Sequence, residues 1–396
     1  MNTELNSLDS FIHSADWLQA RELPVAIELT ETLEPAASGP EVVVFPPTYA
    51  RKDDSGVGHP YAIDIINKDL NPSASEDGKL ANICTLDSVG SQANRMEPAF
   101  AHAPLSSLVP QISFAIGTDS VSLLELGHRL ADGTVRCSDL ADISGQAIAA
   151  WAKNGNAQPI ALLAPTSLVF GFWDSRESGL KAGRVIASTI RATNVSPLKR
   201  SATYFPAPPL RGHLDAAKEC GELEADTKAL SDLGMEAAPS VDTHGGVIVH
   251  GTIQRRTEIN LVALRSLMVR TEDGQLDADS TLALRRYVLG LALVAATAQN
   301  SYNLRQGCLL VRKAASPAVS HVVRPTGERA DFPFTFEQAR TFAAAAAAAF
   351  GIGTNRDATF EIQRLRDNLV QRAAGAAGKK AAKKAAAKKA ATPANA

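Results

Sequence analysis

The sequence predicts an α+β protein, and three observations support this fold class. Short runs rich in β-branched residues, such as 25–30 and 41–45, have the composition and length of strands. Other segments, most clearly 85–100, repeat apolar residues at helical spacing. Apolar residues make up 45% of the 396 residues, which is enough for a sizeable core. This length suggests two to three domains, or one large domain with insertions.

Strand and helix signals follow one another along the whole chain. Strands are expected at residues 25–30, 41–45, 61–66, 111–116, 166–173, 185–195, 201–205, 247–256 and 303–313. Helices are expected at residues 8–20, 85–100, 123–136, 138–153, 258–270, 281–300, 336–350 and 358–374. Residues 50–60, 67–80 and 314–332 have the composition of loops.

Several element ends carry recognisable signals. Pro46-Pro47 stops the second strand, and Asn154-Gly155 ends the helix at 138–153. Asp279 or Ser280 can cap the helix at 281–300, which is apolar on most sides and is therefore expected in the core.

The helix at 85–100 has one apolar face and one polar face. Asp87 or Ser88 can cap its start. Its polar residues, Ser91, Gln92, Asn94 and Arg95, are suited to contacts with phosphate, ribose and base edges. A solvated helix face has the same composition, so both interpretations stay open.

The stretch 159–206 combines three expected strands of one sheet with clustered cations. Its basic residues are Arg176, Lys181, Arg184, Arg191, Lys199 and Arg200. A buried sheet does not need cations this close together, whereas a surface that holds a polyanion does. Solvated loop charges are the alternative.

The formal net charge of −2 hides a division along the chain. Residues 372–396 hold Arg372 and six lysines but no acid, so residues 1–371 carry 33 basic and 42 acidic side chains, or −9. The lysines are Lys379, Lys380, Lys383, Lys384, Lys388 and Lys389. Such a Lys/Ala-rich tail is expected to be disordered, and either binds nucleic-acid backbones non-specifically or only aids solubility.

The polar, mainly acidic segment 207–240 is expected to be an insertion or a protrusion. The body then comprises residues 1–206 and 241–371, with 372–396 as the tail.

Sequence motifs for phosphate loops, zinc proteases and serine hydrolases are absent, which favours a binding protein over an enzyme. The four cysteines form no CxxC pair, so reduced thiols and no metal are expected. His128 beside Arg129 could act as a general acid or base, but a positioning role is the more common one. With no signal sequence and no membrane-spanning run, we expect a cytoplasmic protein.

Several long segments together resemble one family. They are FPPTYA (45–50), YAIDII (61–66), LDSVGSQANRME (86–97), SLLELGHRLADGTVR (122–136), APTSLVFGFWDSR (164–176), RVIASTIRATNVSPLKRSATY (184–204), GGVIVHGTIQRRTEINLVALR (245–265) and LGLALVAATAQNSYNLRQGCLLV (289–311). This pattern resembles the backbone subunit of a type I CRISPR Cascade complex of subtype I-G, formerly I-U, within the RAMP superfamily.

The resemblance implies an RRM-like, ferredoxin-like core with insertions that form a hand with palm, fingers and thumb. It further implies a protein without a cofactor that binds CRISPR guide RNA, assembles head to tail with further copies of itself, and serves antiviral defence. Target DNA would pair with the guide. The other implied partners are the large subunit, the repeat-handle-binding RAMP subunit and the helicase-nuclease, and no membrane is involved.

Under this resemblance, RNA contacts would come from Ser91, Gln92, Asn94, Arg95, His128, Arg129, Arg176, Arg184, Arg191, Lys199, Arg200, Arg255 and Arg256. Clear paired aromatics of the RRM type are missing, so backbone contacts are expected rather than base stacking. Two alternatives remain: a RAMP-type endoribonuclease that processes precursor CRISPR RNA through His128, and a general nucleic-acid-coating protein driven by the tail.

Overall fold

The structure, a computed structural model, describes residues 8–13, 21–37, 39, 42–49, 61–74, 79–175, 178–221, 227–299 and 302–371. Several predicted features therefore lie wholly or partly outside the described residues. They include the loop at 50–60, Arg176, and the Lys/Ala-rich tail.

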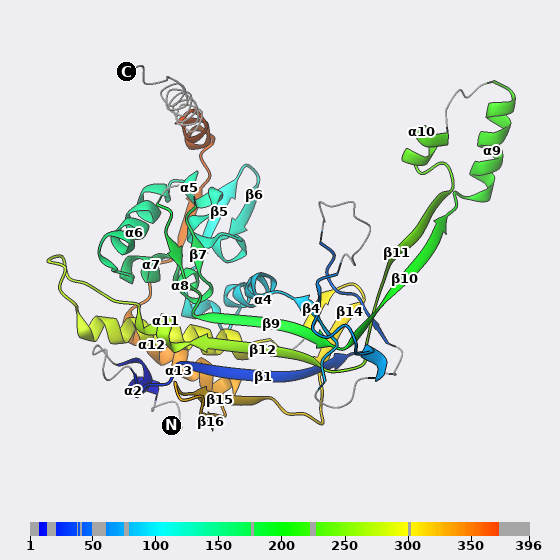
Figure 1. The fold of residues 1–396 in the computed structure, drawn as a ribbon. Coiled ribbons are helices and arrows are strands. Elements are labelled where there is room, and N and C mark those ends of the chain that lie inside the picture. The colour runs from blue at the N-terminus through cyan, green and yellow to red at the C-terminus, as the bar shows by residue number, and fades with distance from the viewer. Residues whose placement is uncertain are drawn as a thin grey trace, which may run out of the picture.

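A nine-stranded sheet forms the centre of the fold (Figure 1). Its main path, in spatial order, is β13 (Tyr302–Arg305), β14 (Cys308–Arg312), β1 (Ala26–Pro35), β12 (Ile253–Asn260), β9 (Ile186–Thr193), β4 (Asn82–Asp87) and β3 (Ile63–Ile65). β15 (Val319–Val323) pairs with the first half of β1, and β16 (Arg329–Asp331) pairs with β15. All of these pairings are antiparallel, which agrees with the α+β class and is compatible with an RRM-like core carrying insertions.

Helices cover one face of this sheet. In β9 and β12, every second side chain from Ile186 and from Ile253 is buried, as expected for strands with one face packed on a core. The covering elements include α4 (Val89–Met96), α8 (Pro165–Phe170) and α12 (Ala278–Thr297). The larger hydrophobic cluster joins these helices to the sheet, whereas the smaller one is built from strand residues of the central sheet and of the base of the ribbon, together with Tyr61.

α12 is the central core helix. Residues 287–296 of this helix are all buried, and α13 (Phe336–Phe350) packs along it. Gly290 makes this approach possible, because a Cβ there would stand 2.8 Å from Ala343 Cα. By length and composition α12 could cross a membrane, but 72% of its apolar window is buried, as in the core helix of a soluble protein. α2 (Leu8–Ile12) and α11 (Leu261–Arg265) pack against α12.

A second group of elements lies on the helix-covered side of the sheet (Figure 1). It contains a small sheet, β17 (Arg356–Thr359), β5 (Ile112–Ile116) and β6 (Asp119–Ser122), and a hairpin of β7 (Phe172–Trp173) and β8 (Lys181–Ala182). Its helices, besides α8, are α5 (Gly133–Arg136), α6 (Ala141–Asn154) and α7 (Gln158–Leu163). Short 3-10 turns connect them: η2 (Glu97–Ala101), η3 (Ser106–Leu108), η4 (Leu123–Glu125) and η5 (Arg129–Ala131), while η1 (Pro72–Ala74) lies further upstream.

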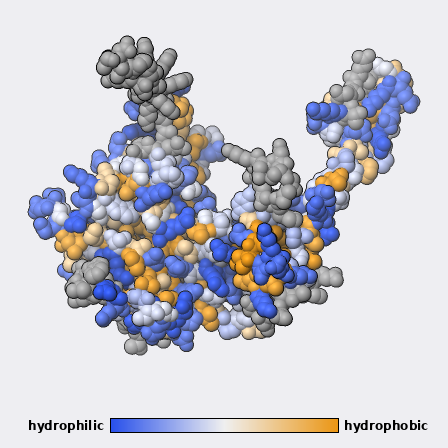
Figure 2. All heavy atoms as spheres, in the orientation of Figure 1, coloured by the Kyte–Doolittle hydropathy of each residue, from blue (hydrophilic) through white to orange (hydrophobic). Residues whose placement is uncertain are grey.

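A long two-stranded ribbon leaves the body at the other end of the sheet (Figure 1). β10 (Val195–Tyr204) pairs with β11 (Ala238–Val249), and β2 (Val43–Val44) anchors the base of β11. α9 (Pro208–Glu219) and α10 (Thr227–Asp232) form the tip, which is mainly hydrophilic in Figure 2. Leu230 is the one buried apolar side chain among the described residues of 207–240. The segment predicted as a polar insertion thus lies at the end of the ribbon.

Most predicted elements are present, with shifted ends. The strands at 25–30, 41–45, 61–66, 111–116 and 185–195 are confirmed, as are the helices at 138–153, 281–300 and 336–350. The helix at 85–100 is confirmed as α4 continued by η2, but its first residues belong to β4. The helix start at 8–20 is α2, and residues 14–20 lie outside the described residues.

The strand predicted at 166–173 is wrong, because most of it forms α8. Pro165 starts this helix and all six of its residues are buried, so its sequence lacks the polar face that distinguishes a helix from a buried strand. The three runs of 159–206 also do not share one sheet, since β9 lies in the central sheet and β10 in the ribbon.

Several other predicted elements differ from the structure in their bounds or in their type. The strand predicted at 247–256 is interrupted around Gly251, where the chain passes from β11 of the ribbon to β12 of the central sheet. The strand predicted at 303–313 is interrupted at Gly307 and forms the β13–β14 hairpin. β12 occupies the start of the helix predicted at 258–270, and β17 the start of the one at 358–374, which is helical at 362–371. The predicted loop at 314–332 contains β15 and β16, and the helix at 123–136 is broken into η4, η5 and α5.

Candidate nucleic-acid interface

α4 presents a short polar surface between the α5–α8 group and the ribbon (Figure 1). The Ser88 hydroxyl caps the helix by accepting a hydrogen bond from the Ser91 amide at 3.3 Å. Ala93 and Met96 are buried against the sheet, whereas Asn94 is exposed and Ser91 is half-buried. The predicted polar face therefore exists, with Asn94 at its most accessible point.

Asp87 fixes the orientation of α4 from the end of β4. Its buried carboxylate accepts hydrogen bonds from Gln92 Nε2 at 2.7 Å and from Arg95 Nε at 3.0 Å. Arg95 also donates through Nη1 and Nη2 to the carbonyls of Asn303 and Leu304 in β13. The Arg95 guanidinium is thus turned toward the protein and positions α4 against β13, although its side chain remains 32% exposed.

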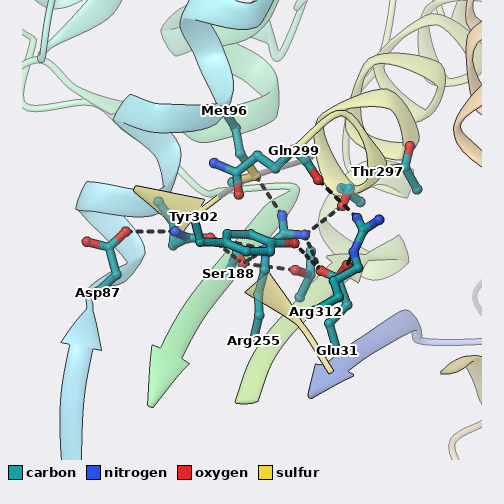
Figure 3. Close-up of polar contacts among 12 residues, drawn as sticks. Glu31, Asp87, Met96, Ser188, Arg255, Thr297, Gln299, Tyr302 and Arg312 are labelled. Carbon is teal, nitrogen blue, oxygen red and sulfur yellow. Dashed lines mark hydrogen bonds and ion pairs between the residues drawn. The ribbon is translucent and has the colours of Figure 1, made fainter. Parts of the chain in front are cut away.

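Arg255, on β12, lies at the centre of a buried polar network below α4 (Figure 3). Its Nη1 donates to Glu31 Oε2 at 2.6 Å and to the Ala296 carbonyl of α12 at 2.8 Å. Its Nε donates to Gln92 Oε1 and to Ser188 Oγ, both at 3.1 Å. One fully buried side chain thereby joins β1, β9, β12, α4 and α12.

Glu31 is the counter-charge of this network. Its carboxylate also accepts hydrogen bonds from Arg312 Nε at 2.6 Å and from the Tyr302 hydroxyl at 2.9 Å (Figure 3). Burial raises the pKa of that hydroxyl, so Tyr302 acts as a donor.

This burial corrects two of the predicted RNA contacts. Gln92 and Arg255 are both fully buried and hydrogen-bonded within the protein, so neither side chain reaches the surface. Sequence reasoning missed Glu31 and Asp87 as structural partners. The sequence did contain a signal for the burial of Arg255. Side chains in a strand alternate between its two faces, so Arg255 shares a face with the apolar residues Ile253 and Ile259.

An open groove of about 410 Å³ lies beside α4. Its lining residues are Asn94, Arg95, Pro98, Ala99, His102, Ala298, Gln299, Tyr302, Asn303 and Leu304. Amide, imidazole and guanidinium groups thus surround a space next to the exposed end of α4. These groups are typical donors to phosphate and sugar oxygens.

Arg129 is a third predicted RNA contact that the structure places in the interior. It is 4% exposed, donates through Nε to Glu97 Oε2 at 2.7 Å and through Nη1 to the Gly171 carbonyl at 3.1 Å. Its backbone φ of 52° is in the left-handed region, which the surrounding contacts must stabilise. Arg129 therefore joins η5 to η2 and to Gly171, the residue before β7, while the neighbouring His128 is exposed.

The Glu97–Arg129 pair makes stability depend on pH. Burial raises the pKa of Glu97 to about 7 from an ordinary value of 4.5, against the opposing effect of Arg129. The folded state therefore binds more protons than the unfolded state between these values, and the free energy of unfolding falls as pH rises through that window. We expect Glu97→Gln to remove this part of the slope when urea unfolding is compared at about pH 5 and about pH 8. The same substitution at the exposed Glu272 is the control, and equal slopes in wild type and Glu97→Gln would contradict the assignment.

Arg191 and Arg256 lie on the opposite face of the sheet from α4. In the register of β9 and β12, Arg191 pairs with Gln254 and Arg256 with Thr189, so the two arginines share one face. Ser188 and Arg255, which contact α4, are on the other face. The residues predicted to contact RNA are therefore divided between the two faces of the sheet.

The other predicted cations are distributed over two further places. Lys199 and Arg200 are exposed on the ribbon, where Lys199 Nζ lies 3.6 Å from Asp242. Arg184 is exposed at the start of β9 and donates through Nε to the Phe170 carbonyl at 3.1 Å.

The cysteines behave as predicted, since all four are free thiols. Burial raises the pKa of Cys84 to about 12 and that of Cys308 to about 11, so both remain protonated. Among the described residues, no three His, Cys, Asp or Glu side chains gather as metal ligands would.

The fold is an α+β body compatible with an RRM-like core that carries insertions. Residues 27–197 match the model of a family described as CRISPR-associated protein GSU0053. The region that is similar to this CRISPR-associated family spans β1, α4, the α5–α8 group and the start of β10. No curated protein matches the chain.

Proposed function

We propose that this chain is a non-catalytic backbone subunit of a type I-G Cascade complex that binds CRISPR guide RNA. The observation that carries the proposal is the groove beside α4, which brings Asn94 and Arg95 together with His102, Gln299 and Asn303. Side chains of this kind hold phosphate and ribose oxygens and carry little sequence information. That is the behaviour required of a protein that must accept guides of any sequence.

In this proposal the guide crosses the surface of α4, with the α5–α8 group on one side and the ribbon on the other (Figure 1). Lys199 and Arg200 on the ribbon and Arg184 beside α8 supply positive charge on the two sides. Because the body carries a net negative charge, these local cations determine where a polyanion binds.

Further copies of the chain would bind head to tail along the same guide, since such contacts are heterologous and extend rather than close. The guide would then pair with target DNA, and the other Cascade subunits and the helicase-nuclease would join this filament in the cytoplasm. We assign no reaction to the chain itself.

Sequencing the RNA that co-purifies with the chain and its companion subunits tests this proposal. A pool dominated by CRISPR guides is expected, and deletion of residues 376–396 should leave that pool bound. Cellular RNA without CRISPR sequences, or complete loss of RNA on tail deletion, would favour a general coating protein.

Incubation with repeat RNA tests the enzymatic alternative. Metal-independent cleavage that disappears in His128→Ala would contradict the non-catalytic assignment.

A further inference from the structure

The β7–β8 hairpin holds a tryptophan at the surface. Trp173 pairs with Lys181 across the hairpin, and Lys181 Nζ lies 4.6 Å from the centroid of the indole ring. Trp173 is 54% exposed, whereas its neighbour Phe172 is 6% exposed and packs edge-on against Trp151 at 6.0 Å. A large aromatic side chain thus remains half in water beside a cation.

The position of Trp173 is structurally fixed. The next residue, Asp174, is 2% exposed, and its Oδ2 accepts hydrogen bonds from the Ser178 amide at 2.8 Å and the Ser178 hydroxyl at 2.7 Å. Arg136 Nη1 lies 3.6 Å from the other carboxylate oxygen of Asp174. The backbone amide of Asp174 also donates to the Leu180 carbonyl at 2.9 Å. The hairpin is therefore closed on the body, and Trp173 is presented by an ordered element.

Arg184 adds a second cation at the base of this hairpin. Its side chain runs along Gly171, where an added Cβ would stand 2.9 Å from Arg184 Cγ. Gly171 has φ of 75°, so both the space and the backbone favour glycine at this contact. Lys181 thus stacks on the indole itself, while Arg184 contacts the residue two positions before Trp173.

A surface cation–π pair contributes only about 0.5–1 kcal/mol, and a lysine can stack on one face of the ring alone. The exposed part of the Trp173 ring can therefore stack on another planar group. Nucleobases of a single strand stack on such rings regardless of base identity, while neighbouring cations hold the phosphates.

We propose that Trp173, with Lys181 and Arg184, forms a stacking site for one nucleobase of a single-stranded nucleic acid. The inference rests on the proposed function, in that the chain binds such a strand on the α4 side of the sheet. It departs from the expectation, drawn from the sequence, that binding involves no base stacking. The stacked base comes either from the guide RNA or from a DNA strand exposed during target binding.

Fluorescence titration of the full chain with oligonucleotides of about eight nucleotides tests the site. Separate titrations use single-stranded RNA and single-stranded DNA, so that the two sources are distinguished. The chain has three tryptophans, Trp17, Trp151 and Trp173, and quenching of emission on binding should be lost in Trp173→Phe. The matched control, Trp151→Phe, should keep that quenching, because Trp151 packs against Phe172 instead of facing solvent.

Affinity supplies the second measurement. Trp173→Ala should weaken binding of the oligonucleotide by about 5-fold to 100-fold, and Trp173→Phe should restore most of the loss because phenylalanine keeps an aromatic face. Thermal unfolding of both variants confirms that the hairpin is intact.

The outcomes separate this inference from the proposed function. Normal binding of guide RNA together with unchanged affinity in Trp173→Ala and no quenching would overturn the stacking site alone. If the wild-type chain bound neither guide RNA nor either oligonucleotide, both proposals would fall. Quenching by only one of the two oligonucleotides supports the site and identifies the strand.

Discussion

Replacing Glu31 by glutamine should lower the free energy of unfolding by about 3–5 kcal/mol, because it leaves Arg255 buried without its counter-charge. Glutamine has nearly the same shape as glutamate, so the change removes charge without opening a cavity. Arg255 is 0% exposed and Glu31 is 2% exposed, and the shortest contact between them is 2.6 Å. Urea unfolding at neutral pH measures the loss.

The same strand offers a matched control. Glu28 lies three residues earlier on the open face of β1 and pairs with Arg329 at 3.2 Å, with both side chains partly exposed. Glu28→Gln should cost only about 0–1 kcal/mol, as is usual for surface ion pairs. A cost below about 1 kcal/mol for Glu31→Gln would show that the network does not hold the sheet and α4 together.

Replacing Asn94 by glutamate should weaken guide RNA binding by about 100-fold, because it places a negative charge where the proposed groove meets the phosphates. Asn94 is exposed on α4 and its side chain is not needed for the buried face of the helix, so the fold should be retained. Filter binding or electrophoretic mobility shift with a guide-length RNA measures the effect.

Charge reversal on the other face of the sheet is the control for this experiment. Arg191→Glu changes the charge by two units, but Arg191 is on the face opposite α4 and should alter binding only about 3-fold through long-range electrostatics. A larger loss with Arg191→Glu than with Asn94→Glu would place the guide on the open sheet face instead.

The sequence predicted the polar surface of α4 but not which of its residues are accessible. Composition cannot distinguish Gln92 from Asn94, because both are amides on one short helix. The difference arises from Asp87 and Arg255, which draw the Gln92 side chain into the sheet. Partners that lie 5 and 163 positions away along the chain cannot be identified from one segment alone.

The division of the cations between two sheet faces could have been predicted in part. Residues 186–193 alternate strictly between buried and more exposed side chains, which places Arg191 opposite Ser188. Which of the two faces the helices cover is set by tertiary packing, and the sequence of one strand does not contain that information.

α8 shows why one run of residues was assigned to the wrong type of element. A short helix buried on all sides, such as Pro165–Phe170, has no periodicity to detect. The exposure of Trp173 was not predicted, because this residue was assigned to the end of a strand in the same apolar run. Its exposure follows from the turn held by Asp174, Ser178 and Arg136.

Cross-linking of guide RNA that contains 4-thiouridine, followed by mass spectrometry of the attached peptides, tests the central claim most directly. If the guide crosses the groove beside α4, the cross-linked peptides should include residues 88–102. They should also include residues 172–182 of the β7–β8 hairpin if the base that stacks on Trp173 comes from the guide. Cross-links confined to β9 and β12 around Arg191 and Arg256, with none on α4, would contradict the proposed path of the RNA.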